Sequence, residues 1–227
     1  PEQGIAIVQD LVSGADFYAY PTLSPDFQNI CWIQWVHPQM PWDGTELWLA
    51  EINELGAIKN ARPVAGGTSE AIMQPKWSPD GKLFYVSDRT NWWNIYWSDE
   101  TMNLASTCDT TPLIPKQAEF AGPLWQLGAS YYDFLDTNNI ACIWNKQGIW
   151  SAGIINLTKR KLIKLETGLN FYHSVRCQNG QFFCVAASSV SGERIVRIFE
   201  TNGSNNVYLP HGSPKSRQLI NNSVTTA

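Results

Sequence analysis

The chain has little charge and no excess of basic residues. Lysine and arginine number 16, aspartate and glutamate 20, so the net charge is −4, and charged residues make up 16% of the 227 positions. Typical globular chains carry about 25% charged residues. Without a basic excess there is little to neutralise phosphates, which argues against a nucleic-acid-binding protein. No stretch approaches the roughly 20 apolar residues of a membrane-spanning helix, so no membrane protein is expected either.

The five cysteines form no metal-binding or disulfide pattern. Their number is odd and no two of them are separated by two residues, which indicates neither a zinc site nor a disulfide framework. Cys31, Cys142 and Cys184 each lie inside an apolar run, where a reduced thiol behaves as a small hydrophobic residue. We therefore expect buried thiols, a reducing and hence cytoplasmic location, and neither a metal nor a cofactor.

Aromatic residues and an internal repeat are what the chain does have. The 11 Trp, 8 Tyr and 9 Phe fall in short clusters, which favours strands over helices. Residues 21–26 (PTLSPD) recur 54 positions later as residues 75–80 (PKWSPD), and residues 123–125 (PLW) look like a third, degenerate copy. A fourth copy keeps only the turn at residues 178–180 (QNG). Each copy leads into apolar runs of strand length.

The repeat predicts an all-β fold, because four short strands about every fifty residues are typical of a β-propeller blade. In the second repeat, the last strand is expected near residues 111–114. We predict one domain over residues 1–227, an incomplete ring of about four four-stranded blades, with a non-repeating β-sandwich as the alternative. The expected blades span residues 16–67, 68–120, 121–169 and 170–220.

A leading strand is expected before the first blade, within residues 1–15. Residues 4–12 are apolar enough to form the outer strand of a preceding blade, or to close the ring onto the last one. An open ring leaves strand edges unpaired, and unpaired edges promote contacts between chains. Self-association is therefore expected unless this strand completes the last blade.

Four runs are more specific than the repeat. They are residues 77–81 (WSPDG) with 86–96 (VSDRTNWWNIY), residues 40–48 (MPWDGTELW), residues 14–21 (GADFYAYP) and residues 118–125 (AEFAGPLW). Together they resemble the propeller domain of the prolyl oligopeptidase clan of serine peptidases, nearest the dipeptidyl aminopeptidase and acylaminoacyl peptidase branch. The resemblance implies a TolB-like propeller followed, in the parent protein, by a C-terminal α/β-hydrolase domain with a Ser, Asp, His triad.

That hydrolase domain is not expected within this sequence. None of the 16 glycines lies in a G-x-S-x-G arrangement, so no nucleophile elbow is present. We expect no catalytic residues here, and the chain alone should hydrolyse nothing. The resemblance implies a non-catalytic part of a peptidase, which gates and positions peptide substrates for the hydrolase domain.

Loops at one face of the propeller supply the candidate binding residues. In a four-stranded blade, the loop between the second and third strands and the link to the next blade emerge at the same face, opposite the Ser-Pro-Asp turns. Carboxylates there are suited to bind the free α-amino group of a peptide, and exposed Trp is a common interface anchor. Alternatively, the arginine pairs within the fold and the paired tryptophans pack between blades. The candidates for contact with substrate or with the hydrolase domain are Trp42, Asp43, Glu70, Arg89, Trp92, Trp93 and Glu119.

Two other functions fit the same residues. A TolB-like scaffold would use the Trp-rich face to bind a protein partner. A carbohydrate-binding propeller would stack Trp rings on sugars. Fold alone does not decide among these functions.

Overall fold

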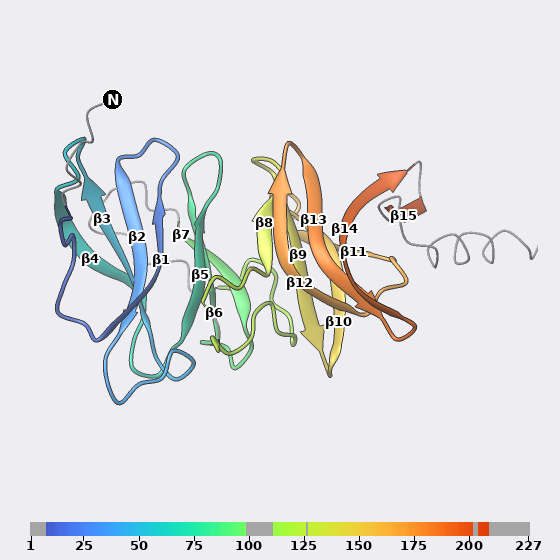
Figure 1. Ribbon diagram of the computed structural model, residues 1–227, viewed down its shortest axis with the longest axis horizontal. Coiled ribbons are helices and arrows are strands. Elements are labelled where there is room, and N and C mark those ends of the chain that lie inside the picture. Colours follow the sequence, from blue (N-terminus) through green and yellow to red (C-terminus); the bar gives the residue numbers. More distant parts are fainter. Residues whose placement is uncertain (1–7, 99–110, 126, 202–203, 209–227) are drawn as a thin grey trace, which may run out of the picture. The chain divides into compact units, whose positions relative to one another are not determined.

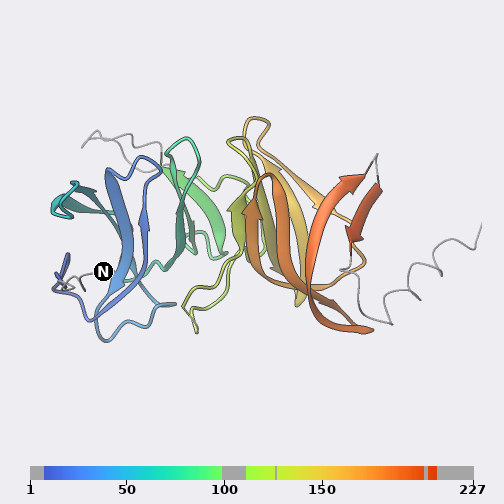
Figure 2. The same cartoon turned by 45° about the horizontal axis from the view of Figure 1, so that its top comes forward.

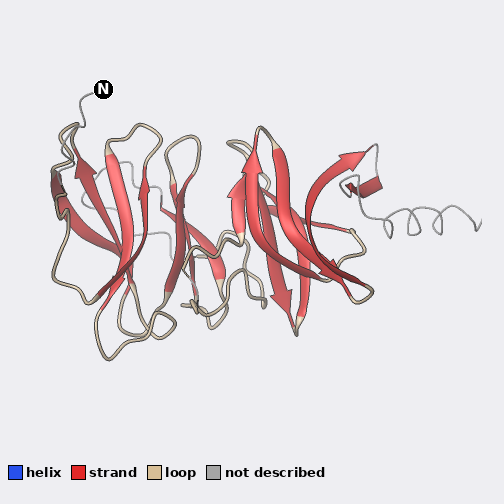
Figure 3. Ribbon diagram, viewed as in Figure 1, coloured by secondary structure: helices blue, strands red, loops and turns tan. Residues whose placement is uncertain are grey.

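The structure is a computed structural model that describes residues 8–98, 111–125, 127–201 and 204–208 (Figure 1). Within these ranges all regular elements are strands (Figure 3). The all-β class expected from the sequence is therefore confirmed. No helix capable of crossing a membrane occurs in this part of the chain.

The described residues form two compact units. The first comprises residues 8–91, 95–98, 111, 123–125 and 127–128. The second comprises residues 92–94, 112–122, 129–201 and 204–208. The organisation of residues 1–227 as one domain stays a prediction.

The first unit contains two antiparallel sheets (Figure 1). One sheet consists of β1 (Phe17–Leu23), β2 (Asn29–Trp35), β3 (Glu46–Ile52) and β4 (Ile58–Gly66). The other consists of β5 (Ile72–Trp77), β6 (Leu83–Ser87) and β7 (Asn94–Ser98), of which Asn94 is counted with the second unit. The two sheets meet at their first strands, where the Trp77 indole Nε1–H donates to the Thr22 carbonyl oxygen at 3.2 Å.

The second unit contains two four-stranded antiparallel sheets with twisted strands (Figure 2). One consists of β8 (Tyr132–Phe134), β9 (Asn139–Lys146), β10 (Ile149–Asn156) and β11 (Lys161–Leu165), and the other of β12 (Phe171–Gln178), β13 (Gln181–Ser188), β14 (Ser191–Thr201) and β15 (Ser204–Tyr208). The two sheets are connected by a backbone hydrogen bond of 2.9 Å from the Val175 N–H, in β12, to the carbonyl oxygen of Ser130, which lies two residues before β8.

Every sheet keeps its strands in chain order, each strand beside the next. This meander distinguishes propeller blades from the Greek-key connections of a β-sandwich. The sequence prediction of an incomplete β-propeller is thereby confirmed.

The Ser-Pro-Asp repeats form the turns that join the first and second strands of a blade. In the β5–β6 turn, the Ser78 hydroxyl donates to Asp80 Oδ1 at 2.6 Å and accepts from the Lys82 N–H at 2.9 Å, and the Ser78 N–H donates to the Lys82 carbonyl at 2.8 Å. Ser24 makes the same three bonds in the β1–β2 turn. The serine therefore satisfies polar groups of the turn where they are buried, which explains why the motif repeats.

A second repeat is visible only in the backbone. Tyr20, Gln74 and Ser174 have φ angles of 54°, 46° and 56°, and each lies where the first strand of its sheet shifts register against the second. A left-handed residue at such a bulge bends the strand and increases its twist. Three blades therefore share one kink, although the three residue types differ.

Three detailed expectations are wrong. Residues 111–114 form no strand, and Pro112 among them cannot donate a ladder hydrogen bond. Residues 123–125 do not occupy the same place in their blade as the other copies of the repeat do. They precede β8, and the turn between the first two strands of their sheet lies at residues 135–139, where the Leu135 N–H donates to the Asn139 carbonyl. Residues 8–12 are not a strand either, and Val8 is exposed.

The rest of that leading strand, residues 4–7, and the segment 99–110 lie outside the described residues. Ring closure by the leading strand and self-association of the chain stay predictions.

Each unit has its own apolar interior. Cys31, Ile33 and Leu47 are fully buried in the first unit, and Cys142 and Cys184 are buried in the second. Burial raises the pKa of the Cys31 and Cys184 thiols to about 12 and raises that of Cys142 as well. The expectation that these three thiols are buried core residues is confirmed.

Candidate functional site

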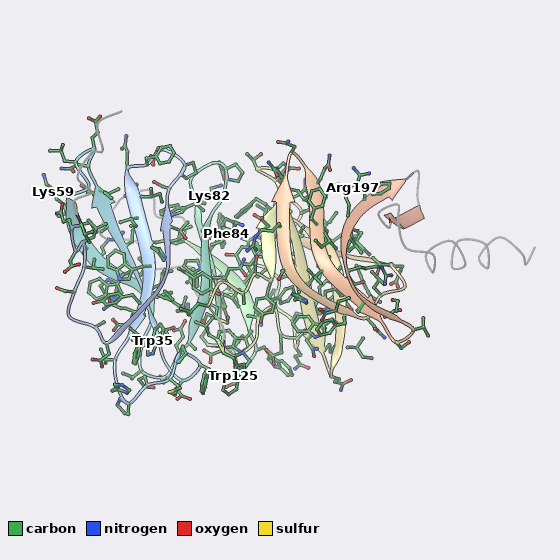
Figure 4. All side chains as sticks on the ribbon, in the orientation of Figure 1. Trp35, Lys59, Lys82, Phe84, Trp125 and Arg197 are labelled. Carbon is green, nitrogen blue, oxygen red and sulfur yellow. The ribbon has the colours of Figure 1, made fainter. Side chains whose placement is uncertain are left out.

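Three loops of the first unit meet at one end of its sheets. They are the β2–β3 loop (residues 36–45), the β4–β5 link (67–71) and the start of the β6–β7 loop (88–91). The Thr45 N–H donates to the Glu70 carbonyl at 3.0 Å, and the Ala71 N–H donates to Asp88 Oδ1 at 2.9 Å. Figure 4 shows Trp35 and Trp125 at this end of the unit and Lys82, in a Ser-Pro-Asp turn, at the other.

Glu70 and Arg89 form an ion pair at this loop end. Glu70 Oε1 lies 2.8 Å from Arg89 Nη2 and also accepts from Arg89 Nε at 2.9 Å. The Ser87 hydroxyl donates to the same oxygen at 2.6 Å. The two side chains are only 20% and 18% exposed. All the bonds to this carboxylate fall on Oε1, so Oε2 has no hydrogen-bond partner within the described part of the chain.

Two tyrosines complete the surroundings of the guanidinium. Arg89 Cζ lies 4.8 Å from the ring centroid of Tyr96 and 6.0 Å from that of Tyr85, and the two rings stack at 5.9 Å. Burial by itself would lower the pKa of Arg89, but interactions with Tyr85 and Glu70 outweigh it, and the pKa is raised. The arginine therefore remains a cation that holds Glu70 in place.

Asp88, next to the pair, differs from Glu70 in its surroundings. Burial raises its pKa, against the opposing effect of the hydrogen bond from the Ala71 N–H. Its Oδ1 is occupied by that backbone bond, so Asp88 serves to hold the link against the β6–β7 loop.

Trp42 and Trp125 form an aromatic pair in the same unit. Their ring centroids are 4.3 Å apart with an interplanar angle of 39°, and Trp125 is 74% exposed. Asp43 Oδ2 accepts from the Met40 N–H at 3.3 Å, and the Asp43 N–H donates back to the Met40 carbonyl at 2.9 Å. Asp43 thus shapes the loop that carries Trp42.

The other three candidates lie in the second unit. Glu119 Oε2 accepts from the Trp93 N–H at 2.9 Å, and the Trp93 carbonyl accepts from the Phe120 N–H at 2.7 Å. Glu119 also exchanges two backbone hydrogen bonds of 2.8 Å with Asn145. Trp92 is 36% exposed. Glu119 therefore anchors the Trp92–Trp93 segment to the sheet of β8–β11.

The structure thus brings the candidates together in two groups. Trp42, Asp43, Glu70 and Arg89 belong to the first unit, whereas Trp92, Trp93 and Glu119 belong to the second. Their roles as contacts for substrate or for another domain stay predictions.

Sequence reasoning missed the neighbours of the ion pair. Ser87, Tyr85 and Tyr96 lie on the strands that flank the β6–β7 loop and are not among the candidates that the sequence offers. Trp125 was part of a recognised motif but was not chosen as a candidate. Their position in the sequence could have indicated them, because Ser87 is the last residue before the loop and the two tyrosines lie within three residues of it on the flanking strands. No group of three or more potential metal-ligating side chains is present among the described residues.

Comparison with solved structures identifies the relatives of the chain. A crystal structure of puromycin hydrolase matches 88% of the chain at 33% sequence identity with a TM-score of 0.78. The chain is homologous to the propeller domain of prolyl oligopeptidase-family peptidases. A puromycin-hydrolyzing peptidase of Mycobacterium tuberculosis gives 32% identity over 88% of the chain, also with a TM-score of 0.78.

This homologous propeller spans only part of its relatives. It covers 30% of the puromycin hydrolase chain and 29% of the mycobacterial peptidase. Prolyl oligopeptidase B from Galerina marginata, at 12% identity and a TM-score of 0.64 over 88% of the chain and 27% of its own, shares the fold. No protein-family model and no curated protein sequence matches the chain.

Proposed function

We propose that the chain is the non-catalytic propeller of a serine peptidase of the dipeptidyl aminopeptidase or acylaminoacyl peptidase type. In this proposal it gates access to the active site of a C-terminal α/β-hydrolase domain and positions peptide substrates there. The observation that carries the proposal is the 33% identity with puromycin hydrolase over 88% of the chain, although the chain covers only 30% of that protein. The chemistry of bond cleavage would be supplied by the hydrolase domain.

The ion pair supports a role in substrate positioning. Glu70 keeps Oε2 available while Arg89 and Ser87 hold Oε1. A carboxylate fixed in this way is preorganised to accept a hydrogen bond from the α-ammonium group of a peptide. A hydrogen bond to a charged group contributes about 1.5–3 kcal/mol, which corresponds to a roughly 10- to 150-fold preference for a free amine.

Glu119 is the second candidate for this contact. One of its carboxylate oxygens is occupied by the Trp93 N–H, which fixes the side chain and leaves the other oxygen for a ligand. Trp42 and Trp125 supply an exposed aromatic surface suited to an apolar substrate side chain or to the hydrolase domain.

The test uses the protein encoded by the complete gene. It would be assayed on an aminoacyl p-nitroanilide, a dipeptidyl p-nitroanilide and their N-acetylated analogues, as wild type and as Glu70→Gln and Glu119→Gln. Glutamine keeps the side-chain length and an acceptor oxygen but removes the charge. Glu54→Gln, at an exposed position in the β3–β4 turn, is the matched control.

We expect one of the two variants to lose 10-fold or more in kcat/KM on free-amine substrates while cleavage of the acetylated analogues changes little. An equal loss on both substrate types would refute amine recognition by that residue. Absence of any peptidase activity in the wild-type protein would refute the peptidase proposal and favour a scaffold that binds a protein partner through the Trp42–Trp125 surface.

A cytoplasmic location belongs to the same proposal. It is supported by the three buried thiols, Cys31, Cys142 and Cys184, which are unpaired.

A further inference from the structure

A basic groove crosses the sheet of β8–β11 in the second unit. Its volume is about 620 Å³, and it is bounded by β9, β10, β11 and the segment 114–116. The lining residues reach from the β9–β10 hairpin, at Lys146 and Gln147, to the β10–β11 turn, at Arg160 and Lys161. These two ends are separated by the eight residues of β10, which is about 23 Å at 3.3 Å per residue. The groove is therefore long enough for about seven residues of an extended chain.

The charge of the groove is opposite to that of the chain as a whole. Five cations line it, and none of the lining residues that the structure describes is acidic. The chain carries 16 cationic and 20 acidic residues, so chance would place both signs here. The cations are Lys116, Lys146, Arg160, Lys161 and Lys164.

Among the described residues, Glu166 forms an ion pair with one of these cations. Glu166 Oε1 lies 3.0 Å from Lys164 Nζ, with side chains that are 75% and 52% exposed. An ion pair so open to solvent contributes little, and the carboxylate of a bound ligand can replace it. The described lining of the groove therefore carries a net positive charge, which an acidic ligand would neutralise.

Lys116 is held in a defined position. The fully buried Asn94 side chain accepts from the Lys116 N–H at 3.2 Å and donates to the Lys116 carbonyl at 3.1 Å. Lys116 Nζ lies 5.6 Å from the centroid of the Trp144 ring. That ring occupies the space beside Gly153, where a Cβ atom would lie 2.8 Å from it. The buried Asn94 amide thus fixes the backbone of Lys116. The absence of a side chain at Gly153 leaves room for the Trp144 ring, which lies below the Lys116 ammonium group.

The apolar lining favours a peptide over other polyanions. Ile149 is 63% exposed in the groove, and Leu162 and Pro115 line it as well. Trp144 is only 4% exposed, so it offers no face for stacking of nucleic-acid bases. Four of the five cations are lysines, which are point charges without the bidentate fork with which arginine grips a phosphate. Charges spread over about 23 Å suit several carboxylates along one chain.

From these observations we infer that the groove binds an acidic polypeptide segment in an extended conformation, with an apolar side chain placed on Ile149. The site lies outside both groups of candidate residues for peptidase function. Its occupation does not depend on the proposed activity.

The probe is a fluorescein-labelled decapeptide of alternating glutamate and leucine, titrated with the purified protein and followed by fluorescence anisotropy at 50 and 300 mM NaCl. We expect saturable binding that weakens at least five-fold at the higher salt, because salt screens exposed charges. A peptide with lysine in place of glutamate should not bind.

Two variants locate the site. Lys146→Glu should raise Kd ten-fold or more, since it replaces an attraction by a repulsion at an exposed position. Ile149→Ser, which leaves the charge unchanged, should raise Kd about three- to ten-fold. Lys59→Glu is the matched control for charge, because Lys59 lies in β4 of the first unit (Figure 4) and should leave Kd within two-fold. Circular dichroism would verify that all variants are folded.

Several results would overturn the inference. They are an absence of binding, equal effects of Lys146→Glu and Lys59→Glu, or an affinity unaffected by salt. Stronger competition by tripolyphosphate or by single-stranded oligouridylate than by the unlabelled peptide would assign the groove to phosphate or RNA instead.

Discussion

Separating Glu70 from Arg89 should destabilise the first unit by an amount that the structure allows us to estimate. Removal of one partner of a fully buried ion pair costs about 3–5 kcal/mol, because the remaining charge is left unpaired. These side chains are 20% and 18% exposed, so the remaining charge is partly hydrated. We expect Glu70→Ala and Arg89→Ala each to lower the free energy of unfolding by about 2–3 kcal/mol.

The double variant distinguishes a true pair from two independent residues. Once both charges are gone, neither is left unpaired, so the double variant should be about 1–2 kcal/mol more stable than the sum of the single losses predicts. The assay is urea unfolding at pH 7, followed by tryptophan fluorescence, with unchanged m-values as the condition for comparing stabilities.

The exposed pair of Lys164 and Glu166 serves as the control cycle. Its side chains are 52% and 75% exposed, and its coupling should stay below about 0.5 kcal/mol. If the Glu70 and Arg89 effects add to within 0.5 kcal/mol, the two residues do not stabilise each other, and the view that Arg89 holds the carboxylate for a ligand is refuted.

Four further predictions concern the turns, the packing and the thiols. Ser78→Ala should cost about 1–3 kcal/mol in urea unfolding, since it leaves buried turn groups without a partner; no change would contradict the role of the motif. The hydrogen bond from Ser78 lowers the pKa of Asp80. The ionised Asp80 carboxylate therefore contributes stability above about pH 4, and this contribution is lost as the pH falls through the lowered folded-state pKa. Asp80→Asn should make acid unfolding less steep, and an identical pH profile would contradict this. Gly153→Ala should lower stability by about 1–3 kcal/mol, because its Cβ would lie 2.6 Å from the Ile163 carbonyl oxygen, whereas Gly192→Ala, with no atom within 4 Å, should be close to neutral. A thiol reagent at pH 8 should leave three cysteines unmodified in the folded protein and modify them after unfolding, as expected for the buried, raised-pKa thiols of Cys31, Cys142 and Cys184; fast modification of any of the three would be incompatible with that burial.

Sequence reasoning succeeded where the determinant is local. The Ser-Pro-Asp turns follow from residue types that bond within a few positions of themselves, and the strands β2, β3, β6 and β13 follow from apolar runs between such turns. The burial of Cys31, Cys142 and Cys184 follows from the apolar runs that contain them. These features can be inferred because each depends on neighbours in the sequence.

It failed where the determinant is a partner far along the chain. Glu70 meets Arg89 from the other side of the β5–β6 hairpin, and Trp42 meets Trp125 from more than eighty residues away. Residues 123–125 resemble a repeat by composition, yet they lie in a loop because β8 occupies the first position of its sheet. Composition does not specify which of several similar segments pairs with a given strand.

The kink shared by Tyr20, Gln74 and Ser174 has a consequence for protein engineering. A residue other than glycine in the left-handed region costs about 1–2 kcal/mol, so glycine at these three positions relieves strain without changing the course of the strand. The kink is also present in β12, although no Ser-Pro-Asp turn follows that strand. The shared backbone geometry thus marks equivalent positions in three blades, which are natural junctions for exchanging one blade for another.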